Sequence, residues 1–332
     1  MRETVLVTGG AGYIGSHTAL ALLEADHEVV VIDNYVNSIP GALDIVSDIS
    51  GKSLSEIEGD VRDRTLVEKV IRDKGVTAVI HMASLKAVGE SVERPLSYYG
   101  NNLEGAIAVL DAMQAADVWK FVFSSSATVY GDPDTCPIPE SAPIGATNPY
   151  GMTKEMIEQI LKDVANSDPR WTVTSLRYFN PIGAHPSGRI AEAPVGKPLN
   201  LMPMVMDVAT GKRDKVMVYG DDYATPDGTG VRDYIHIMDL VEGHVAALEH
   251  MDSQTGFEAY NLGQGTGASV LELIAAVERT TGRKVAYEIT DRRPGDVAEC
   301  VADPSRANAE LGWATSRSLD QACADAWNSQ NA

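Results

Sequence analysis

The sequence has 332 residues, 44% of them hydrophobic and 22% charged, which is enough for two packed domains with ordinary globular cores. Its formal net charge of −20 argues against nonspecific binding to nucleic acid or to an anionic membrane surface. No apolar run reaches the length of a membrane span, and the first residues lack the segments of a signal peptide. The cysteines Cys136, Cys300 and Cys323 lie far apart without metal or disulfide spacing, so we expect a reducing cytoplasm.

A glycine-rich loop follows the first predicted strand. The apolar run 4–8 leads directly into Gly9-Gly-Ala-Gly-Tyr-Ile-Gly15, and a helical stretch covers 16–25. Glycines at this spacing let the backbone approach a pyrophosphate, which the positive end of the helix then faces. The next strand, 28–32, is followed by Asp33, whose carboxylate is placed to accept hydrogen bonds from an adenosine ribose. The stretch predicts a dinucleotide site, and the acid favours NAD over NADP because it would repel a 2′-phosphate.

Strands and helices continue to alternate up to residue 180. We expect a third strand ending at Asp60, strands at 77–82, 120–125 and 172–178, and helices at 63–74, 98–116 and 150–166. This alternation predicts an α/β fold with a Rossmann-type, doubly wound parallel sheet covered by helices on both faces. Ligands of such sheets gather at the carboxyl ends of the strands. The residues that this rule brings into one crevice are Asp33, Asp60, Met82-Ala83, Ser124 to Ser126 and Phe179-Asn180.

Tyr150 and Lys154 lie four residues apart and share one face of the predicted helix that Asn148-Pro149 starts. A lysine ammonium close to a phenol stabilises the phenolate and lowers the pKa of the tyrosine. A tyrosine of this kind can take a proton from a sugar or alcohol hydroxyl near neutral pH. By itself the pair is a weak signal, because an exposed helix face gives the same spacing by chance.

The character of the sequence changes after Asn180. Residues 181–203 are rich in proline and glycine, and we interpret them as the crossing into a smaller, mixed α/β substrate domain. There we expect a strand at 216–219, a loop at 227–234, and helices at 239–249 and 270–280. The predicted domains are 1–180 for the dinucleotide and 181–332 for the substrate, with segments at about 231–262 packing back on the first.

Several motifs together resemble a known family. Thr8-Gly-Gly-Ala-Gly-Tyr-Ile-Gly15, Ser124-Ser-Ser-Ala-Thr-Val-Tyr-Gly131 and Tyr150-Gly-Met-Thr-Lys154 resemble those of extended short-chain dehydrogenases/reductases. The more specific motifs, which narrow the resemblance to the UDP-glucose 4-epimerases, are Lys86-Ala-Val-Gly-Glu-Ser91, Arg177-Tyr-Phe-Asn-Pro181, Gly183-Ala-His-Pro-Ser-Gly188 and Val231-Arg-Asp-Tyr-Ile-His236. The resemblance covers nearly the whole chain.

The resemblance implies an isomerase of galactose metabolism that holds NAD tightly, does not consume it, and interconverts UDP-glucose and UDP-galactose. Tyr150 would take the proton from the sugar 4-hydroxyl while the C4 hydride passes to the nicotinamide. The 4-keto sugar would then turn about its pyrophosphate link and take the hydride back on its other face. Lys154 would hold the nicotinamide ribose and lower the pKa of Tyr150, and Ser126 would hydrogen-bond the sugar oxygen and relay its proton.

The resemblance also assigns two sets of binding residues. The residues matching the family's NAD site are Gly9, Gly12, Tyr13, Ile14, Asp33, Asn34, Asn37, Ser38, Asp60, Val61, Met82, Ala83, Lys86, Asn101, Ser126, Tyr150, Lys154 and Phe179. Those matching its UDP-sugar site are Lys86, Ser126, Asn180, Asn200, Leu201, Val216, Val218, Tyr219, Arg232, Arg293 and Asp296. The two arginines suit a pyrophosphate, because a guanidinium can make bidentate charge-assisted hydrogen bonds to it.

Two segments depart from the family pattern. His81-Met-Ala-Ser84 stands where aromatic and glycine residues are frequent, and we expect little change because the contact there is largely made by backbone. Cys300 stands where several members have a tyrosine lining the sugar pocket. A cysteine leaves room for a 2-acetamido group, so UDP-GlcNAc and UDP-GalNAc are also expected substrates. His17, His81, His185, His236 and His244 show no metal spacing, and we expect structural roles for them and no metal site.

Two other functions remain open as alternatives. A nucleotide-sugar dehydratase would carry an Asp-Glu pair, and a decarboxylase a glutamate, where this chain has Ala127 and Thr128. A regulator that binds NAD without catalysis should have lost Tyr150 or Lys154, and both are present. The resemblance implies UDP-hexoses as the small-molecule partners. It also implies a second copy of the chain, because the family is commonly a homodimer joined through two helices per subunit, here 98–116 and 150–166.

Overall fold

The computed structural model describes residues 2–193, 196, 198, 200–293 and 295–330. A seven-stranded sheet with the order β10-β6-β5-β4-β1-β2-β3 forms its centre, and every neighbouring pair in it is parallel. The strands are β1 (Thr4–Thr8), β2 (Glu28–Asp33), β3 (Ser55–Glu58), β4 (Ala78–His81), β5 (Lys120–Ser126), β6 (Thr172–Tyr178) and β10 (Gly256–Leu262). The predicted Rossmann-type, doubly wound fold is confirmed.

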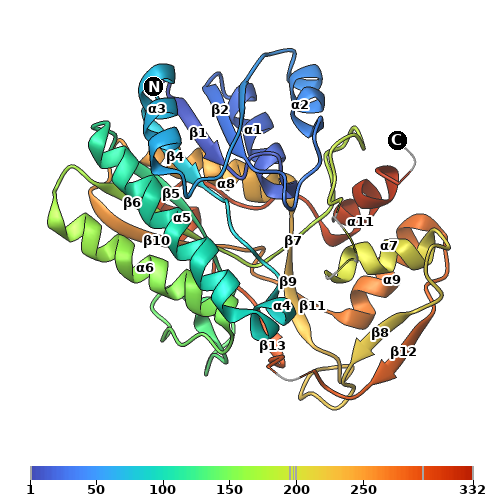
Figure 1. Ribbon diagram of the computed structural model, residues 1–332. Helices are drawn as coiled ribbons and strands as arrows, with labels where there is room; N and C mark the ends of the chain where they lie inside the picture. The colour runs from blue at the N-terminus through green and yellow to red at the C-terminus, as the bar shows by residue number, and fades with distance from the viewer. Residues whose placement is uncertain (1, 194–195, 197, 199, 294, 331–332) are drawn as a thin grey trace.

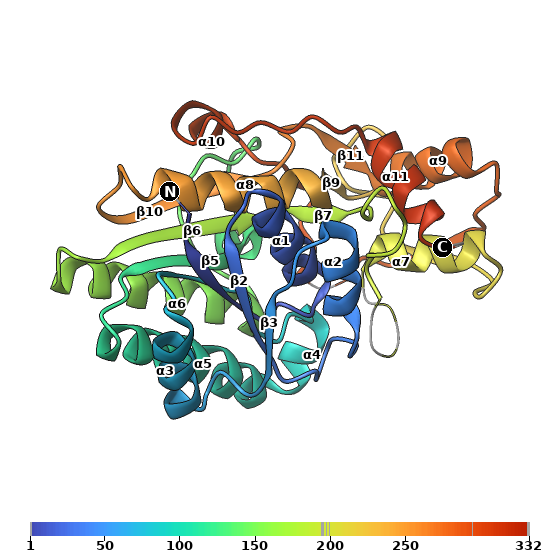
Figure 2. The same ribbon diagram turned by 90° about the horizontal axis from the view of Figure 1, so that it is seen from above.

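Helices cover both faces of this sheet, as Figures 1 and 2 show. On one face lie α1 (Tyr13–Glu24), α2 (Ala42–Ser50) and α8 (Ile237–His250); on the other lie α3 (Arg64–Lys74), α5 (Pro95–Ala115) and α6 (Pro149–Ser167). Successive side chains of a strand point to opposite faces. In β1, accordingly, Val5 and Val7 pack into the core beneath α1 and α8, whereas Leu6 packs into the core beneath α3 and α5.

Local signals in the sequence fix the start of the helix α6, which carries Tyr150 and Lys154. Asn148 accepts a hydrogen bond from Gly151 N through Oδ1 at 2.9 Å, and Pro149 occupies the first turn of α6. The short helix α4 (Val88–Glu93) precedes α5, and the 3₁₀ helix η1 (Ala127–Tyr130) continues directly from β5. These elements bring the helix with the Tyr-Lys pair against the carboxyl end of β5.

The remaining elements build a smaller mixed assembly around a separate core of buried residues. Its strands β7 (Asn180–Ile182), β9 (Val231–His236), β11 (Gly267–Ser269) and β13 (Glu299–Cys300) form one sheet, and β8 (Val216–Tyr219) pairs with β12 (Tyr287–Thr290). Its helices are α7 (Leu201–Ala209), α9 (Val270–Thr281) and α11 (Leu319–Asn328), while α10 (Ser305–Glu310) lies beside β10. β11 runs antiparallel to β9, whereas β7 and β13 are parallel to it.

Two expectations for this half of the chain need correction. The second half of the expected loop 227–234 is wrong, because β9 begins at Val231 and pairs with β7, β11 and β13. Gly228 and Gly230 indicate a turn, but the turn ends where the alternating residues of the strand begin. The expected crossing 181–203 contains part of β7 and the start of α7, and its residues 194, 195, 197 and 199 lie outside the described residues.

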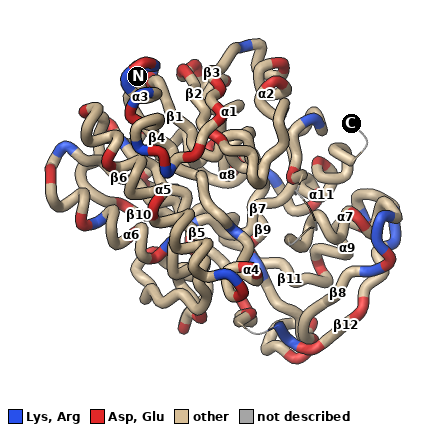
Figure 3. The backbone as a smooth tube through the Cα atoms, in the orientation of Figure 1, with Lys and Arg blue, Asp and Glu red and all other residues tan. Residues whose placement is uncertain are grey.

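The segment 237–262 adjoins the large sheet, since α8 packs on α1 and β10 pairs with β6. The division into domains at residue 180 stays a prediction. None of the helices in the described ranges is both long and apolar enough to cross a bilayer. Figure 3 shows acidic and basic residues interspersed along the backbone, so an anionic ligand must find its positive charges locally.

Candidate active site

Two neighbouring cavities mark the candidate site. The first has a volume of about 280 Å³ and opens beside the glycine loop and the carboxyl ends of β2 and β4. The second has a volume of about 210 Å³ and is lined by residues of β7, α7, β8 and β9. Tyr178 lines the first and Asn180 the second, so the chain passes from one cavity to the other within three residues.

Most of the residues assigned by resemblance line one of these cavities. Those lining the first are Gly9, Gly12, Tyr13, Ile14, Asp33, Asn34, Asn37, Ser38, Asp60, Val61, Met82, Ala83, Lys86, Asn101 and Tyr150. Those lining the second are Asn180, Asn200, Leu201, Val218, Tyr219, Arg232, Arg293 and Asp296. Four residues from the two sets, and also Cys300, line neither of the two cavities; the four are Ser126, Lys154, Phe179 and Val216.

The glycine loop fits a bound dinucleotide. A Cβ on Gly15 would lie 2.3 Å from Gly9 O, so this glycine is required by the close contact of helix and loop. A Cβ on Gly12 would meet only Gly9 O, at 3.4 Å, and Gly12 lines the first cavity. Packing of the protein against itself therefore does not require a glycine at position 12. Gly12 is also the N-cap of α1 and has no side-chain cap, which leaves first-turn N–H groups for an anion.

Asp33 lies at the end of β2, as predicted, and is held rigidly. Its Oδ2 accepts a hydrogen bond from Ala11 N at 2.9 Å, and its Oδ1 accepts from Tyr35 N at 2.9 Å and Ser38 Oγ at 2.8 Å. A carboxylate oxygen can accept at least two hydrogen bonds. Oδ2 therefore keeps capacity for a ribose hydroxyl, and the fixed carboxylate suits an adenosine ribose at this edge of the cavity.

Tyr150 and Lys154 occupy one face of α6. The Lys154 side chain is buried, and its Nζ donates to Ser124 O at 2.7 Å and to Ser84 Oγ at 3.1 Å. The same Nζ lies 5.8 Å from the centroid of the Tyr150 ring. Gly151 lets this end of the helix approach η1, because a Cβ there would lie 3.0 Å from Thr128 O. The predicted pair is therefore brought together, with Tyr150 lining the first cavity and Lys154 buried.

The expected lowering of the Tyr150 pKa is not found. Burial raises the pKa of Tyr150 to about 12, against a smaller opposing effect of the Ser126 hydroxyl. Burial also lowers the pKa of Lys154 to about 7, although Glu158 raises it. The physical reason is that both groups lose hydration, which disfavours the charged form of each.

One of the serines around Lys154, Ser84, contributes its side chain, which the sequence did not predict. Ser84 was expected to act through its backbone, but its hydroxyl accepts the Lys154 hydrogen bond and the residue lines the first cavity. Ser126 caps η1 by accepting from Thr128 N at 3.2 Å, and its hydroxyl also reaches Tyr150. Phe179 instead packs its side chain in a small core with Tyr130 and Ala302.

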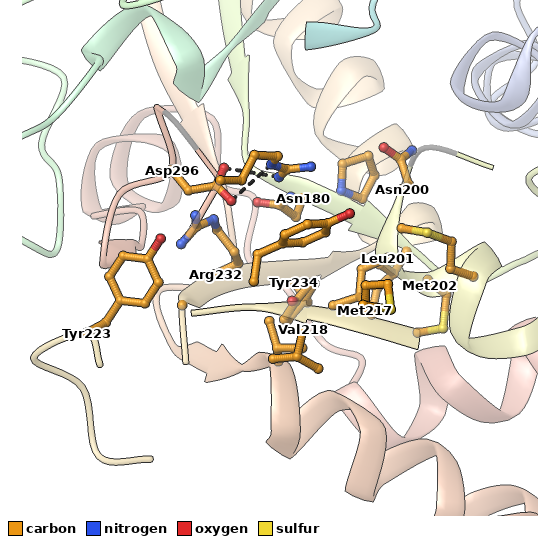
Figure 4. Close-up of a pocket in the computed structure, with 17 residues that line it drawn as sticks. Asn180, Asn200, Leu201, Met202, Met217, Val218, Tyr223, Arg232, Tyr234 and Asp296 are labelled. Carbon is orange, nitrogen blue, oxygen red and sulfur yellow. Dashed lines mark hydrogen bonds and ion pairs between the residues drawn. The ribbon is translucent and has the colours of Figure 1, made fainter. Parts of the chain in front are cut away.

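The second cavity carries the two predicted arginines. Arg232 lies on β9, and Arg293 makes a bidentate ion pair with Asp296 at 3.0 and 3.1 Å. In Figure 4, Arg232 and Asp296 lie on one side of the cavity, with Leu201 and Met202 on the other. The cavity thus combines two guanidinium groups with an apolar wall, which suits a ligand that has an anionic part and a flat uncharged part.

The sequence did not predict some residues that line the second cavity, and one residue assigned to it, Val216, is buried in the core instead. Val216 is 1% exposed in the core below β8, and Met217 lines the cavity in its place. Tyr234 also lines the cavity. Its position two residues after Arg232 would have revealed it, since alternate residues of a strand share a face, had β9 been recognised as a strand. Met202 and Tyr223 carry no comparable signal in the sequence.

Cys300 lies on β13 directly opposite Arg232 of β9. It is half-buried and packs at the edge of the core formed by Phe179 and its neighbours. Burial raises the pKa of its thiol to about 11, against a smaller opposing effect of Arg232, so the thiol is neutral at physiological pH. Its position next to a residue that lines the second cavity keeps it a candidate for shaping the sugar pocket.

The buried histidines have protein partners. His81 Nδ1 lies 2.8 Å from Thr8 Oγ1, and His236 Nε2 lies 3.1 Å from Asp325 Oδ2. Among the residues that the structure describes, no cluster of three or more histidine, cysteine or acidic side chains is arranged to hold a metal ion.

Comparisons with known proteins match the chain to one family model and to several UDP-glucose 4-epimerases. A family model described as GDP-mannose 4,6 dehydratase matches residues 6–326. The UDP-glucose 4-epimerase of Bacillus subtilis is 57% identical over 98% of this chain and 96% of its own. A Bifidobacterium longum UDP-glucose 4-epimerase solved with NAD⁺ and UDP shares 52% identity, with a TM-score of 0.96 over 99% of this chain and 98% of its own. The Stenotrophomonas enzyme solved with NAD and a formylated UDP-arabinopyranose shares 47% identity, with a TM-score of 0.98 over 99% and 98% of the two chains.

Proposed function

The chain belongs to the UDP-glucose 4-epimerase family of extended short-chain dehydrogenases/reductases, and from this premise we propose that it inverts C4 of UDP-hexoses with a bound NAD. Its principal reaction interconverts UDP-glucose and UDP-galactose. The observation that carries the proposal is that Tyr150, paired with Lys154, lines a cavity fit for a dinucleotide, beside a second cavity with two arginines.

Each residue of the pair has a role that its surroundings support. Tyr150 takes the proton from the sugar 4-hydroxyl, and Ser126, within reach of its phenol, hydrogen-bonds the same sugar oxygen. Lys154 is held by Ser124 O and Ser84 Oγ, so its ammonium stays fixed beside the phenol. NAD, when bound, supplies the acceptor for the C4 hydride and returns it. A positive nicotinamide next to Tyr150 would favour the phenolate, which counters the effect of burial.

The diphosphate is assigned to the second cavity. Arg232 and Arg293 supply positive charge there, in a chain whose formal net charge is −20. We assign Asn180, Asn200 and Leu201 to the same ligand, because they line the same cavity. The glycine loop and Asp33 hold the NAD, with the pyrophosphate at the start of α1 and the ribose at the end of β2.

The matching family model is named after a dehydratase, which makes this the alternative to consider. Dehydration needs an acid/base pair after C4 is oxidised. The positions following Ser126 are Ala127 and Thr128, neither of which titrates in a useful range. The chain therefore carries the groups for oxidation and return of the hydride, without that pair.

Acetylated sugars belong to the proposed substrate range. Cys300 stands opposite Arg232, and its side chain is shorter than tyrosine by most of an aromatic ring. The 4-keto sugar must turn within its pocket, so each ring substituent needs space in two orientations. A small residue here leaves that space for the 2-acetamido group of UDP-GlcNAc and UDP-GalNAc.

We also propose a cytoplasmic homodimer joined through α5 and α6. Leu96 at the start of α5 is 84% exposed, Ile107 is 45% exposed, and Met156 on α6 is 41% exposed. Apolar side chains gathered on neighbouring helices favour a protein interface. The three cysteines are free thiols, in keeping with a reducing compartment. Light scattering after gel filtration measures the oligomeric state, and Leu96→Glu should shift it toward the monomer.

The decisive experiment incubates purified protein with UDP-galactose and adds no NAD. Formation of UDP-glucose is expected, together with NAD(H) released on denaturation at close to one equivalent per chain. The same assay with UDP-N-acetylgalactosamine tests the wider substrate range. Loss of a 6-hydroxyl as water, in place of a C4 epimer, would show a dehydratase instead.

A further inference from the structure

A buried ion pair lies one helical turn beyond Lys154. The side chains of Glu158 on α6 and Arg177 on β6 are only 1% and 3% exposed, and Arg177 Nη2 lies 2.7 Å from Glu158 Oε2. Neither residue lines either of the two cavities. Replacing a buried pair by apolar residues is often neutral for stability, so stability alone does not explain two charges at this place.

The Glu158 carboxylate fastens α6 to two strands of the large sheet. Its Oε1 accepts hydrogen bonds from Ser125 Oγ of β5 at 2.7 Å, from Ser175 Oγ of β6 at 2.9 Å and from Arg177 Nε at 3.0 Å. Hydrogen bonds to a charged acceptor are short and strongly directional. A displacement of α6 along the sheet would break several of them at once, so they fix the position of the helix.

The same face of α6 carries the reacting pair. Tyr150, Lys154 and Glu158 follow one another at intervals of four residues and therefore lie in one row along the helix. Each meets one of three successive residues of β5. The Ser126 hydroxyl reaches Tyr150, Ser124 O accepts from Lys154 Nζ, and Ser125 Oγ donates to Glu158.

We propose that the Glu158–Arg177 ion pair positions Tyr150 and Lys154. The ion pair fixes α6 on β5, and it places the negative charge of Glu158 one helical turn from the Lys154 ammonium. The inference rests on the proposed function, which gives Tyr150 and Lys154 their roles. Arg177 is itself anchored, since its Nη1 donates to Tyr130 OH at 2.9 Å and to Glu140 O at 3.1 Å. The pair thus ties α6 to η1 and to the segment after it.

Among the groups around Lys154, Glu158 is the one whose charge acts on the Lys154 ammonium. His81 on β4 has its pKa lowered to about 3 by burial, so it is neutral at working pH. Burial raises the pKa of Tyr150 and Tyr178, which favours their neutral forms, and the centroid of the uncharged Phe123 ring lies 4.9 Å from the ammonium. On β6, Arg177 faces the Glu158 carboxylate from the other side, with Tyr130 next to it.

Two single variants with opposite charge effects test the proposal. Glu158→Gln leaves an unpaired Arg177 cation, which disfavours the protonated form of Lys154, whereas Arg177→Met leaves the carboxylate, which favours it. Both variants release α6, so we expect kcat to fall by about 10- to 100-fold in each, as for a misplaced reacting group, with KM changed less than threefold. The alkaline limb of the kcat–pH profile should move to lower pH in Glu158→Gln and to higher pH in Arg177→Met.

A double variant separates positioning from stability. Glu158→Met/Arg177→Met buries no unpaired charge, so its thermal unfolding should lie near that of the wild type while kcat stays low. Ser125→Ala removes a single hydrogen bond and serves if the single charge variants do not fold; a several-fold loss of kcat is expected there. Glu155→Gln is the matched control, because it makes the same change on the same helix, where the carboxylate binds Ala146 N at 2.9 Å. Its kcat and pH profile should equal those of the wild type.

The outcomes are distinguishable from those of the proposed function. Failure of wild type and Glu155→Gln to form a C4 epimer would refute the function, whatever the other variants do. A stable double variant with wild-type kcat, or alkaline limbs that move in the same direction in both single variants, would overturn the positioning role. NAD(H) content after denaturation is a readout besides activity. It should stay close to one equivalent in all variants, because neither Glu158 nor Arg177 lines the first cavity.

Discussion

Gly12 and Gly15 should respond to the same substitution for different physical reasons. At Gly12 the backbone has φ −72° and ψ 175°, which any residue adopts, and a Cβ would meet only Gly9 O at 3.4 Å. Gly12→Ala should therefore leave the cofactor-free protein as stable as the wild type or more stable by about 0.4–1 kcal/mol, through the smaller entropy of its unfolded chain.

Gly15→Ala meets backbone atoms that cannot move aside independently. Its Cβ would lie 2.3 Å from Gly9 O and 2.6 Å from Gly10 Cα. Overpacking of this kind costs about 1–3 kcal/mol, which outweighs the gain of about 1 kcal/mol from alanine in a helix when the neighbours are rigid. We expect the cofactor-free Gly15→Ala protein to be the less stable of the two.

Urea unfolding of the cofactor-stripped proteins measures these stabilities, and NAD(H) released on denaturation measures binding. Gly12→Ala should lose most of its NAD(H) and the stabilisation by added NAD, which for wild type reaches about 2.7 kcal/mol at a hundredfold excess over Kd. The Cβ would occupy the space that the pyrophosphate needs. A Gly12→Ala protein with a full complement of NAD(H) would refute the assignment of the loop. One destabilised by several kcal/mol without cofactor would show that packing, not ligand, requires this glycine.

Three further predictions concern the reaction, the substrate range and the pH dependence of folding stability. Tyr150→Phe should lower kcat by about 10²- to 10⁴-fold while UDP still binds, and Lys154→Met should also damage turnover; near-normal activity of Tyr150→Phe in the epimerase assay would show another base. Cys300→Tyr should reduce kcat/KM for UDP-N-acetylglucosamine far more than for UDP-glucose, and an unchanged ratio, or a wild type inactive on the acetylated sugar, would contradict a role of Cys300 in specificity. Burial raises the pKa of Asp233 to about 6, above its unfolded value, even though it accepts from Gln264 N, Gly265 N and Ala302 N. Its contribution to stability is thus complete below pH about 4 and lost as the pH rises through 6. Asp233→Asn should flatten the free energy of unfolding over that range, as urea titrations at several pH values will show.

The large sheet could be predicted because its signals are local. The short buried run of β1 stands directly before glycines, and that of β2 ends in Asp33. The loop at Gly9 to Gly15 and this acid have fixed places in a strand–helix–strand unit. The cap at Asn148 likewise marks the start of α6 in the sequence itself. Each of these features is set by neighbours within a few residues, so no knowledge of the remaining fold is needed.

The smaller sheet was harder to predict because its strands are short and depend on distant partners. β9 was expected to be part of a loop since Gly228 and Gly230 precede it, and its edges are completed by β7, β11 and β13, which come from three separate parts of the chain. The lining residue Tyr234 was missed together with the strand. The resemblance supplied Arg232, but only the strand shows why Arg232 and Tyr234 share a face.

The sequence by itself determined the doubly wound fold, the glycine loop with its acid, and the Tyr150–Lys154 spacing, because local backbone geometry and helical periodicity encode all three. Only the tertiary structure decided the protonation states of Tyr150 and Lys154. Burial disfavours the charged forms of both Tyr150 and Lys154. The Ser84 hydroxyl accepts a hydrogen bond from Lys154, and Glu158, paired with Arg177, lies one helical turn from Lys154. Desolvation depends on atoms brought together from β4, β5, β6 and α6, and no spacing along the chain records how closely they pack.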